Sequence, residues 1–318
     1  MLTGILSRTA RTGNTRRRGG EVAPAFTGSK IEASVKLMTT THTRAAIRRC
    51  RTARRSTRNE EMSSETDHGN AQSQPRTALV TGGTSGIGRA IANKLVDAGF
   101  HVFVTGRRQA QLDTLVDELG DAITAVRGDV ASVEDLDAVY AAIAQRGTGL
   151  DLVVANAGGG TFATLEDLDP EAYDQTFATN VRGTVFTVQK ALPLLNAQAS
   201  IVTIGSTSAS RATAAFGVYS ASKAAVRQFS RVWAIELAPR GIRVNTVTPG
   251  PTETPGLAGL ASDPAESRAL LDQEAGRVPL QRLGRPSEIA DAVLFLASPQ
   301  AGFITGTELF VDGGESQV

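Results

Sequence analysis

From residue 76 onward, short runs of apolar residues alternate with longer segments whose apolar residues recur every three or four positions. Each short run ends at a glycine or a polar residue, as buried strands do, whereas the longer segments have the period of an amphipathic helix. In the first long segment, Ile87, Ile91 and Leu95 would share one helical face. The pattern predicts seven strands, within residues 77–82, 101–106, 123–129, 150–158, 200–206, 243–250 and 308–314.

The segments between most of these strands are about ten or more residues long, which is enough for helical crossovers and therefore for parallel strands. The strands are nearly continuous in apolar residues, which is typical of a sheet covered by helices on both faces. We therefore predict an α/β fold, a doubly wound, Rossmann-type and mostly parallel seven-stranded sheet. It would form one domain over residues 76–318.

Residues 1–75 differ in composition and are predicted to be a disordered or processed tail. Residues 1–58 contain 14 Lys and Arg against 2 Asp and Glu, whereas the rest of the chain contains 19 basic and 30 acidic residues. The basic segment has no sustained apolar period, so it would bury too little surface to offset its chain entropy. An Arg-rich transit peptide, a nucleic-acid contact and a later start at Met38 or Met62 are the open alternatives.

Composition excludes several classes of protein. The chain is 41% hydrophobic and 20% charged, and it has no run of 18 apolar residues that would predict a membrane span. Cys50 is the only cysteine, so a disulfide within one chain is excluded and a reducing, cytoplasmic location is expected, or a mitochondrial one if the tail is a transit peptide. The three histidines lack the spacing of metal ligands, so no metal site is predicted.

The segment TGGTSGIG, residues 81–88, lies between the first predicted strand and the first predicted helix. Gly82, Gly86 and Gly88 would allow a tight turn and a close approach of the backbone to a ligand. The N-terminus of the helix offers unpaired N–H groups and the positive end of its dipole, which suit a pyrophosphate. This context predicts a nucleotide site, and a plain strand-to-helix turn is the alternative.

The residues after the second strand favour NADP(H) over NAD(H). An acidic residue there would bind the ribose of NAD, whereas an arginine would bind the 2′-phosphate of NADP. The chain has Arg107 and Arg108 at this place and no carboxylate, and guanidinium groups bind phosphate through two hydrogen bonds. Asp129, after the third strand, would meet the adenine amino group. Two solvated surface arginines and a simple turn aspartate are the alternatives.

Tyr219 and Lys223 are four residues apart in a predicted helix, so they share one face. Lowering the pKa of a phenol from near 10 by about three units requires roughly 4 kcal/mol. An ammonium about 4 Å away supplies roughly that at an effective dielectric of about 20. We therefore expect Lys223 to lower the pKa of Tyr219 and to make it an acid/base group. The alternative is a core tyrosine beside a lysine whose stem is buried.

Over nearly all of residues 76–318 the chain resembles the short-chain dehydrogenase/reductase family. The resemblance lies in a set of motifs that occur in the family's order. They are TGGTSGIG (81–88), GDV (128–130), NAG (156–158), TNVRG (179–183), Ser206 thirteen residues before the tyrosine, YSASK (219–223), PGPTET (249–254) and the stretch 282–314. The resemblance implies an oxidoreductase that transfers a hydride between NADP(H) and a ketone or secondary alcohol.

The resemblance also implies the catalytic roles. Tyr219 would exchange the proton with the substrate oxygen, Ser206 would hydrogen-bond that oxygen, and Lys223 would bind the nicotinamide ribose. Asn180 would anchor a water molecule in a proton relay. A strand-end turn serine and a helix-packing amide are the alternative interpretations of Ser206 and Asn180.

The resemblance further implies a set of cofactor contacts. Asn156 and Gly158 would support the strand end beside the cofactor, and Thr254 would meet the nicotinamide amide unless it is only a helix N-cap. Ser85 replaces a basic residue that many NADP-preferring relatives carry, so Arg107, with Arg108, would be the main phosphate contact. The predicted cofactor-binding residues are Gly82, Ser85, Gly86, Ile87, Gly88, Arg107, Arg108, Asp129, Val130, Asn156, Gly158, Tyr219, Lys223, Pro249, Gly250, Thr252 and Thr254.

The stretch 255–279 consists mostly of small and aliphatic residues with mixed charges, which predicts a mobile lid over an uncharged or weakly polar substrate.

Two other functions stay open. One is a 3-oxoacyl-carrier-protein reductase, which would need a basic docking surface. The other is a non-catalytic NADP-binding regulator, which would be expected to lack Tyr219 or Lys223. The resemblance implies a homotetramer formed through the helices of Asn180 and Tyr219 and through the last strand; no membrane or nucleic-acid partner is expected.

Overall fold

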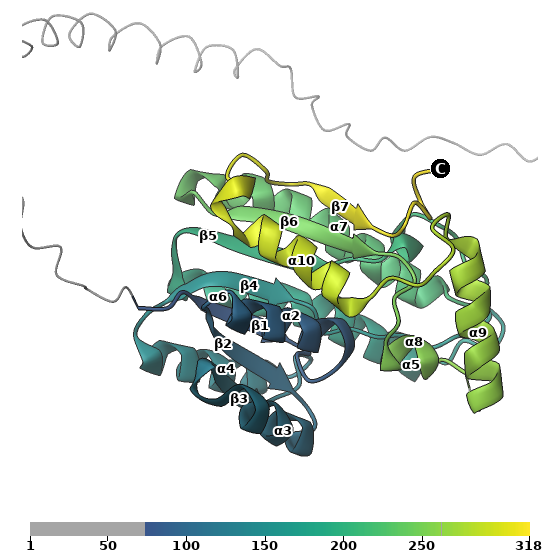
Figure 1. The fold of residues 1–318 in the computed structure, drawn as a ribbon, viewed down its shortest axis with the longest axis horizontal. Coiled ribbons are helices and arrows are strands. Elements are labelled where there is room, and N and C mark those ends of the chain that lie inside the picture. The colour runs from purple at the N-terminus through teal and green to yellow at the C-terminus, as the bar shows by residue number, and fades with distance from the viewer. Residues whose placement is uncertain (1–73, 262) are drawn as a thin grey trace, which may run out of the picture. The chain divides into compact units, whose positions relative to one another are not determined.

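The computed structural model describes residues 74–261 and 263–318, so the predictions for the tail lie outside the described residues except for its last two positions. In the described part, seven strands form one sheet in which every neighbouring pair is parallel (Figure 1). The strands are β1 (Thr77–Thr81), β2 (His101–Gly106), β3 (Ile123–Arg127), β4 (Leu150–Ala155), β5 (Leu195–Ile204), β6 (Arg243–Pro249) and β7 (Glu308–Val311). The predicted doubly wound α/β fold is confirmed.

Helices cover both faces of the sheet because each presents one apolar stripe to it. The first face is covered by α2 (Gly86–Asp97), α3 (Gln109–Leu119) and α10 (Pro286–Ala297), whose buried side chains share one hydrophobic cluster. The second face is covered by α4 (Val133–Arg146), α6 (Gly183–Ala191) and α7 (Gly217–Leu237). The remaining helices are α5 (Pro170–Phe177), α8 (Pro255–Ala258) and α9 (Pro264–Arg277).

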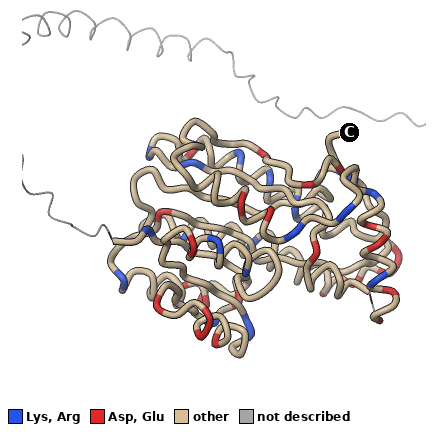
Figure 2. The backbone as a smooth tube through the Cα atoms, viewed as in Figure 1, with Lys and Arg blue, Asp and Glu red and all other residues tan. Residues whose placement is uncertain are grey.

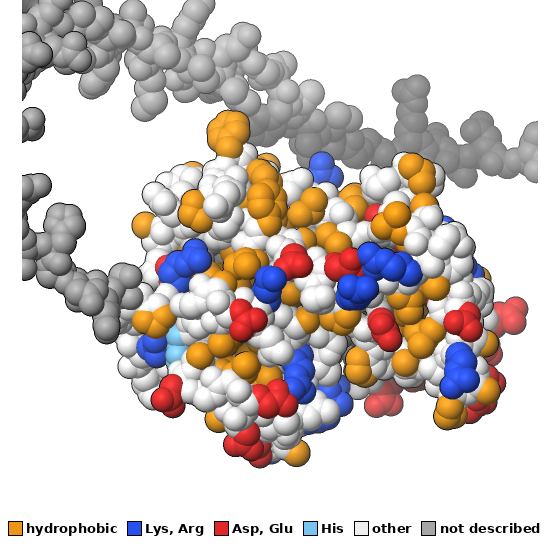
Figure 3. Space-filling view, in the orientation of Figure 1, with side chains coloured by type: hydrophobic (Ala, Val, Ile, Leu, Met, Phe, Trp, Pro, Cys, Tyr) orange, Lys and Arg blue, Asp and Glu red, His pale blue; other side chains and the backbone are white. Residues whose placement is uncertain are grey.

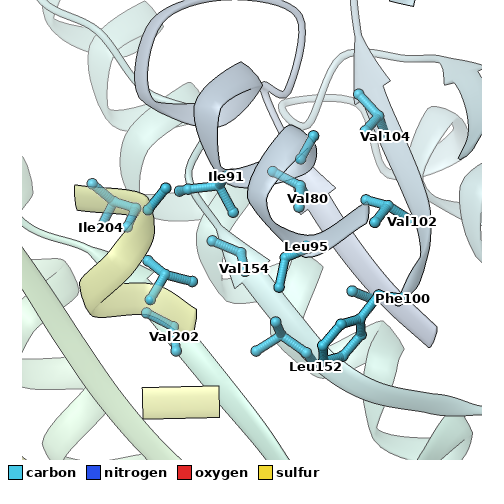
Figure 4. Packing of buried hydrophobic residues seen from close by; sticks show 14 of the residues in the cluster. Val80, Ile91, Leu95, Phe100, Val102, Val104, Leu152, Val154, Val202 and Ile204 are labelled. Carbon is cyan, nitrogen blue, oxygen red and sulfur yellow. The ribbon is translucent and has the colours of Figure 1, made fainter. Parts of the chain in front are cut away.

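The hydrophobic cluster on the first face of the sheet packs α2 against the central strands (Figure 4). Ile91 and Leu95 of α2 pack on Val80 of β1 and Val154 of β4, and all four are fully buried or nearly so. Burying an aliphatic side chain of this size contributes roughly 1.5–3 kcal/mol. The turn between β1 and α2 therefore rests on a rigid base.

The strand order is β3-β2-β1-β4-β5-β6-β7. The chain leaves β3 at one edge and returns as β4 on the other side of β1, so the order reverses between β1 and β4. The loops that follow these two strands therefore diverge. In open α/β sheets this point, at the carboxyl ends of the strands, is where ligands bind.

One strand differs from its prediction, because β5 begins at Leu195 rather than at Ser200. Its first residues are polar or partly exposed, so an apolar pattern does not detect them. They are held instead by a side-chain contact, since the Asn196 amide donates to Asp151 Oδ1 over 2.9 Å and to the Thr148 carbonyl over 3.0 Å. The pairing register of β4 with β5 shifts at the same place, between Leu150 and Leu152.

Two findings concern the described residues as a whole. None of their helices is long and apolar enough to cross a membrane. Their His, Cys, Asp and Glu side chains form no group of three or more that could hold a metal ion.

Candidate active site

A cleft of about 1060 Å³ lies at the carboxyl ends of the strands. Its lining comes from the loops after β1, β2, β3, β4, β5 and β6, from the start of α7, and from α5, α8 and α9. All the predicted catalytic and cofactor-binding residues line it except Asn180. The switch point of the sheet and the motifs of the sequence thus identify the same place.

The glycine-rich turn needs its glycines. Gly82 has φ 64° and Gly86 has φ 53°, a left-handed conformation that favours glycine. A Cβ on Gly88 would lie 2.2 Å from the Gly82 carbonyl oxygen and 2.4 Å from Asn156 Nδ2. Asn156 itself donates to the carbonyls of Thr81, over 2.9 Å, and Gly82, over 3.2 Å. The end of β4 therefore holds the turn in place.

The N-terminus of α2 opens into the cleft. Its N-cap residue, Ser85, makes no side-chain capping bond, so the first N–H groups of the helix stay available to an anion. Arg108 Nη2 donates to Ser85 Oγ over 3.3 Å. Arg107 Nη1 lies 3.8 Å from Asp129 Oδ2, which is a long ion pair at an exposed site. A cationic patch thus borders the helix terminus, and the donors present fit a phosphate-bearing cofactor.

Asn180 lies behind the cleft, in a π-helical turn between α5 and α6 that spans Ala178–Arg182. Its side chain is almost fully buried. Oδ1 accepts from the Gly159 N–H over 2.9 Å, and Nδ2 donates to the Gly159 carbonyl over 2.8 Å and to Ser222 Oγ over 2.9 Å. Asn180 therefore ties the loop after β4 to α7 through two backbone groups of Gly159 and the hydroxyl of Ser222.

Lys223 is buried at the base of the cleft, where its Nζ donates to the Ile204 carbonyl over 2.9 Å. Nζ lies 5.7 Å from the centre of the Tyr219 ring. Burial lowers the pKa of Lys223 to about 8, because the protonated form loses its hydration. The predicted shared helix face is thus present in the structure.

The direction of the Tyr219 pKa differs from the expectation. Burial raises the pKa of Tyr219, and the hydrogen bond with Ser206 lowers it by a smaller amount. Loss of hydration outweighs the hydrogen bond with Ser206, and burial also disfavours the cationic form of the neighbouring Lys223. In this structure Tyr219 is a proton donor, and its conversion to a phenolate requires a further positive charge or donor.

Sequence reasoning missed an aromatic stack beside the tyrosine. Phe216 is stacked on Tyr219 with 4.4 Å between ring centres, and Phe162 lies 4.7 Å from Phe216. A Cβ on Gly160 would lie 2.8 Å from Tyr219 Cβ and Cδ2, so the loop after β4 passes directly over the ring. The run of three glycines at 158–160 was the signal in the sequence, since a close backbone approach requires them.

Two further ion pairs line the cleft and were also missed. Arg211 Nη1 lies 2.9 Å from Glu315 Oε1, and Arg277 Nη1 lies 2.7 Å from Glu274 Oε1. The first pair joins residues more than a hundred positions apart, so no local pattern could have found it. In each pair the two charges cancel at close range.

The loop after β6 closes the cleft near the glycine-rich turn. Thr254 is the N-cap of α8, as its Oγ1 accepts from the Leu257 N–H over 3.1 Å. Its side chain also lies against the position that a Cβ of Gly86 would take. Thr252 is buried and donates to the Gly250 carbonyl over 2.9 Å. Thr254 therefore caps α8 and also faces the glycine-rich turn.

Comparison with known proteins identifies the family. A family profile described as enoyl-(acyl carrier protein) reductase matches residues 82–316. Oxidoreductase asL5 of Sarocladium schorii is 42% identical over 76% of this chain and 96% of its own, and the 3-oxoacyl-[acyl-carrier-protein] reductase FabG of Vibrio cholerae is 37% identical over 75% and 96%. The chain belongs to the short-chain dehydrogenase/reductase family, whose members act on CH–OH and carbonyl groups with NAD(P)(H).

Solved structures agree with this assignment. A short-chain dehydrogenase/reductase from Brucella melitensis, described as a glucose/ribitol dehydrogenase, has a TM-score of 0.71 and 34% identity over 76% of this chain and 97% of its own. A 3-ketoacyl-(acyl-carrier-protein) reductase from the same organism, complexed with NADH, has a TM-score of 0.70 and 33% identity over 76% and 98%. The chain is therefore an oxidoreductase with a nicotinamide-nucleotide fold.

Proposed function

We propose that residues 76–318 form a single catalytic domain that transfers a hydride between NADP(H) and a ketone or secondary alcohol, with Tyr219 as the acid/base group. The observation that carries this proposal is the meeting of Tyr219, Ser206 and Lys223 in one cleft. Ser206 lowers the pKa of the tyrosine through its hydroxyl, and Nζ of the buried Lys223 lies 5.7 Å from the centre of the tyrosine ring. This arrangement places a proton donor and a hydroxyl beside each other with space for a substrate oxygen.

The residues of the chain would act on that oxygen in concert. When bound, the nicotinamide cofactor supplies the hydride for reduction or accepts it in oxidation. Tyr219 Oη donates its proton to the carbonyl oxygen as charge develops there, and Ser206 Oγ donates a hydrogen bond to the same oxygen. The Lys223 cation stabilises the phenolate that remains, and Asn180 holds Gly159, and with it the loop over Tyr219, in position.

The proposed activity can be tested with the full chain. We expect oxidation of NADPH in the presence of simple ketones, and slow reaction with keto acids. The reason for the second expectation is that Arg211 and Arg277 are already neutralised by Glu315 and Glu274, so neither arginine would favour a substrate carboxylate. Binding of NADPH without reduction of any ketone or aldehyde would contradict the proposal and favour a nucleotide-binding regulator. A strong preference for keto acids would contradict the uncharged substrate.

The preference for NADP(H) is proposed from the arginines at the end of β2. Arg108 touches Ser85 at the start of α2, so a 2′-phosphate beside the glycine-rich turn would lie within reach of its guanidinium and near Arg107. We expect the double variant Arg107→Ala/Arg108→Ala to weaken NADPH binding by about a hundredfold or more, since each charge-assisted hydrogen bond contributes roughly 1.5–3 kcal/mol and each arginine supplies at least one. NADH binding should change little.

The measurement is the dissociation constant of each nucleotide from cofactor fluorescence. Arg89→Ala is the matched control, because Arg89 is an arginine of α2 that pairs with Glu118 and does not line the cleft. It should leave both constants unchanged. Equal losses for NADPH and NADH in the double variant would show that the arginines do not select the phosphate.

A second candidate function is the reduction of 3-oxoacyl groups on a carrier protein, and the names of two similar proteins favour it. An acidic carrier would need a basic docking surface. Residues 76–318 instead contain 19 Lys and Arg and 26 Asp and Glu, and the face in Figure 3 and the trace in Figure 2 have both signs of charge intermixed. Reduction of a carrier-bound 3-oxoacyl group much faster than of its short thioester analogue would establish this function.

We also propose that the protein is a homo-oligomer, with a tetramer as the expected form. On α7, Phe229, Val232 and Ile235 are exposed, and Ile235 has 78% of its surface accessible. Apolar residues at this helical spacing form a stripe that a second copy would cover. Light scattering that gave the mass of a single chain would contradict the proposal.

The proposed location is the cytoplasm, with the mitochondrion as the alternative if the tail is a transit peptide. The support is the single cysteine, Cys50, which is typical of reducing compartments. Cell fractionation combined with mass spectrometry of the native N-terminus would decide it, since a cleaved chain in mitochondria would contradict a cytoplasmic location.

A further inference from the structure

Three aromatic rings from two segments form a continuous stack that includes the proposed proton donor. Phe162 follows the glycine run after β4, Phe216 precedes α7, and Tyr219 lies in the first turn of that helix. The ring centres are 4.7 Å apart for Phe162 and Phe216, at an interplanar angle of 40°, and 4.4 Å apart for Phe216 and Tyr219, at 26°. Both phenylalanines line the cleft.

The backbone holds these rings where they are. The Ala163 N–H donates to the Ala215 carbonyl over 2.7 Å, so the two loops that carry the phenylalanines are joined next to the rings. Ala215 adopts φ 58°, a left-handed conformation that is strained for alanine. Asn180 fixes the other end of the first loop through its two hydrogen bonds to Gly159. The Ala163–Ala215 hydrogen bond and the hydrogen bonds of Asn180 thus hold Phe162 and Phe216 in place as an apolar surface.

That surface is open to the cleft. Phe162 has 43% of its surface exposed, and Phe216 is half-buried. Leu257 and Leu260, in and just after α8, and Leu270 of α9 are also half-buried and line the same cleft. Binding of an apolar ligand against these partly exposed apolar side chains is favourable, because it removes their surface and that of the ligand from water. The charged side chains nearby are paired, so they do not oppose an uncharged ligand.

We propose that Phe162 and Phe216 are specificity residues that bind a ring, aromatic or alicyclic, attached directly to the reacting carbonyl. This inference rests on the proposed ketone reduction at Tyr219. A ring is favoured over a linear chain for two reasons. A compact ring would cover the exposed part of Phe162, by stacking if it is aromatic and through its C–H groups if it is alicyclic, and it has little internal rotation to lose on binding, whereas an alkyl chain loses several rotors. Phe216 contacts both Phe162 and Tyr219, and all three side chains line one cleft, so a ring held by the two phenylalanines would lie along this stack and share the cleft with the tyrosine.

The test compares two ketones of equal carbon number, cyclohexyl methyl ketone and 2-octanone, with the full chain and NADPH. Both are dialkyl ketones, so their intrinsic reactivity is similar. We expect the parent to prefer the cyclic ketone by about tenfold or more in kcat/KM, and Phe162→Ala to abolish that preference. Phe162→Trp should retain it. Leu165→Ala is the control, because Leu165 lies in the same loop with 91% of its surface exposed and does not line the cleft.

A binding measurement separates failure of this inference from failure of the proposed function. Saturation-transfer NMR with acetophenone should detect binding to the parent and to Leu165→Ala, and should detect none with Phe162→Ala. Binding of this kind without turnover of any ketone would support the ring site and contradict the proposed reaction. Ketone turnover with no cyclic preference, or a preference that survives Phe162→Ala, would overturn the ring site and leave the reaction intact.

Discussion

Replacing Tyr219 by phenylalanine is expected to lower kcat for ketone reduction by about a thousandfold, within the range for loss of a general acid. The substitution removes one oxygen and keeps the ring, so the stack with Phe216 at 4.4 Å should persist. Because burial raises the pKa of Tyr219 above that of a free phenol, the group carries its proton across the neutral range and serves as the donor in reduction. The loss should therefore appear in the chemical step.

The measurement is steady-state NADPH oxidation together with the dissociation constant of NADPH, which should stay within about twofold of the parent. Tyr173→Phe is the matched control, since Tyr173 of α5 stacks on Phe177 and does not line the cleft. It should retain full activity. Retention of more than a tenth of the parent kcat by Tyr219→Phe would mean that another group donates the proton.

The parts of the site that sequence reasoning found are those encoded in short segments. Gly82, Gly86 and Gly88 lie within one turn, and their backbone requirements can be stated from residue type alone. Tyr219 and Lys223 lie within one helix, where spacing determines the shared face. The sheet was equally accessible, because buried parallel strands joined by crossover helices have a strong apolar pattern. Local rules were sufficient in each of these cases.

The parts that could not be predicted depend on contacts between distant segments. The stack of Phe162 on Phe216 arises only when the loops after β4 and β5 meet, and the hydrogen bonds of Asn180 with Gly159 arise only when the loop after β4 meets the turn between α5 and α6. The start of β5 is fixed by polar contacts of Asn196 rather than by apolar residues. The predicted direction of the Tyr219 pKa shift was wrong. Burial raises this pKa, and burial depends on the tertiary structure, which the spacing of Tyr219 and Lys223 does not show.

Replacing Lys223 by methionine is expected to lower kcat/KM for ketone reduction by about a hundredfold or more, as for other groups that stabilise charge in a transition state. It should also change how stability depends on pH. In the folded protein Lys223 has a pKa of about 8, below its ordinary value of 10.5, because burial disfavours the cation. Between these two values the unfolded chain holds a proton that the folded chain has released, so the free energy of unfolding rises with pH there.

The slope from this one group is up to about 1.4 kcal/mol per pH unit, and it is absent below pH about 8, where both states are protonated. Urea unfolding of the parent and of Lys223→Met from pH about 7 to about 9.5 should therefore give curves that diverge only above pH about 8, with the parent gaining relative to the variant. Staying below pH about 10 keeps the opposite contribution of Tyr219 small, since its raised pKa reduces stability only at higher pH.

Lys94→Met is the control for this measurement. Lys94 of α2 is partly exposed and pairs with Asp291, which raises its pKa, so its titration falls above the window. Its curve should run parallel to that of the parent. Parallel curves for the parent and Lys223→Met would mean that Lys223 is not desolvated in the folded protein. A loss of activity without the change in slope would then point to a role of the lysine in cofactor binding alone, whereas both effects together follow from one buried cation beneath Tyr219.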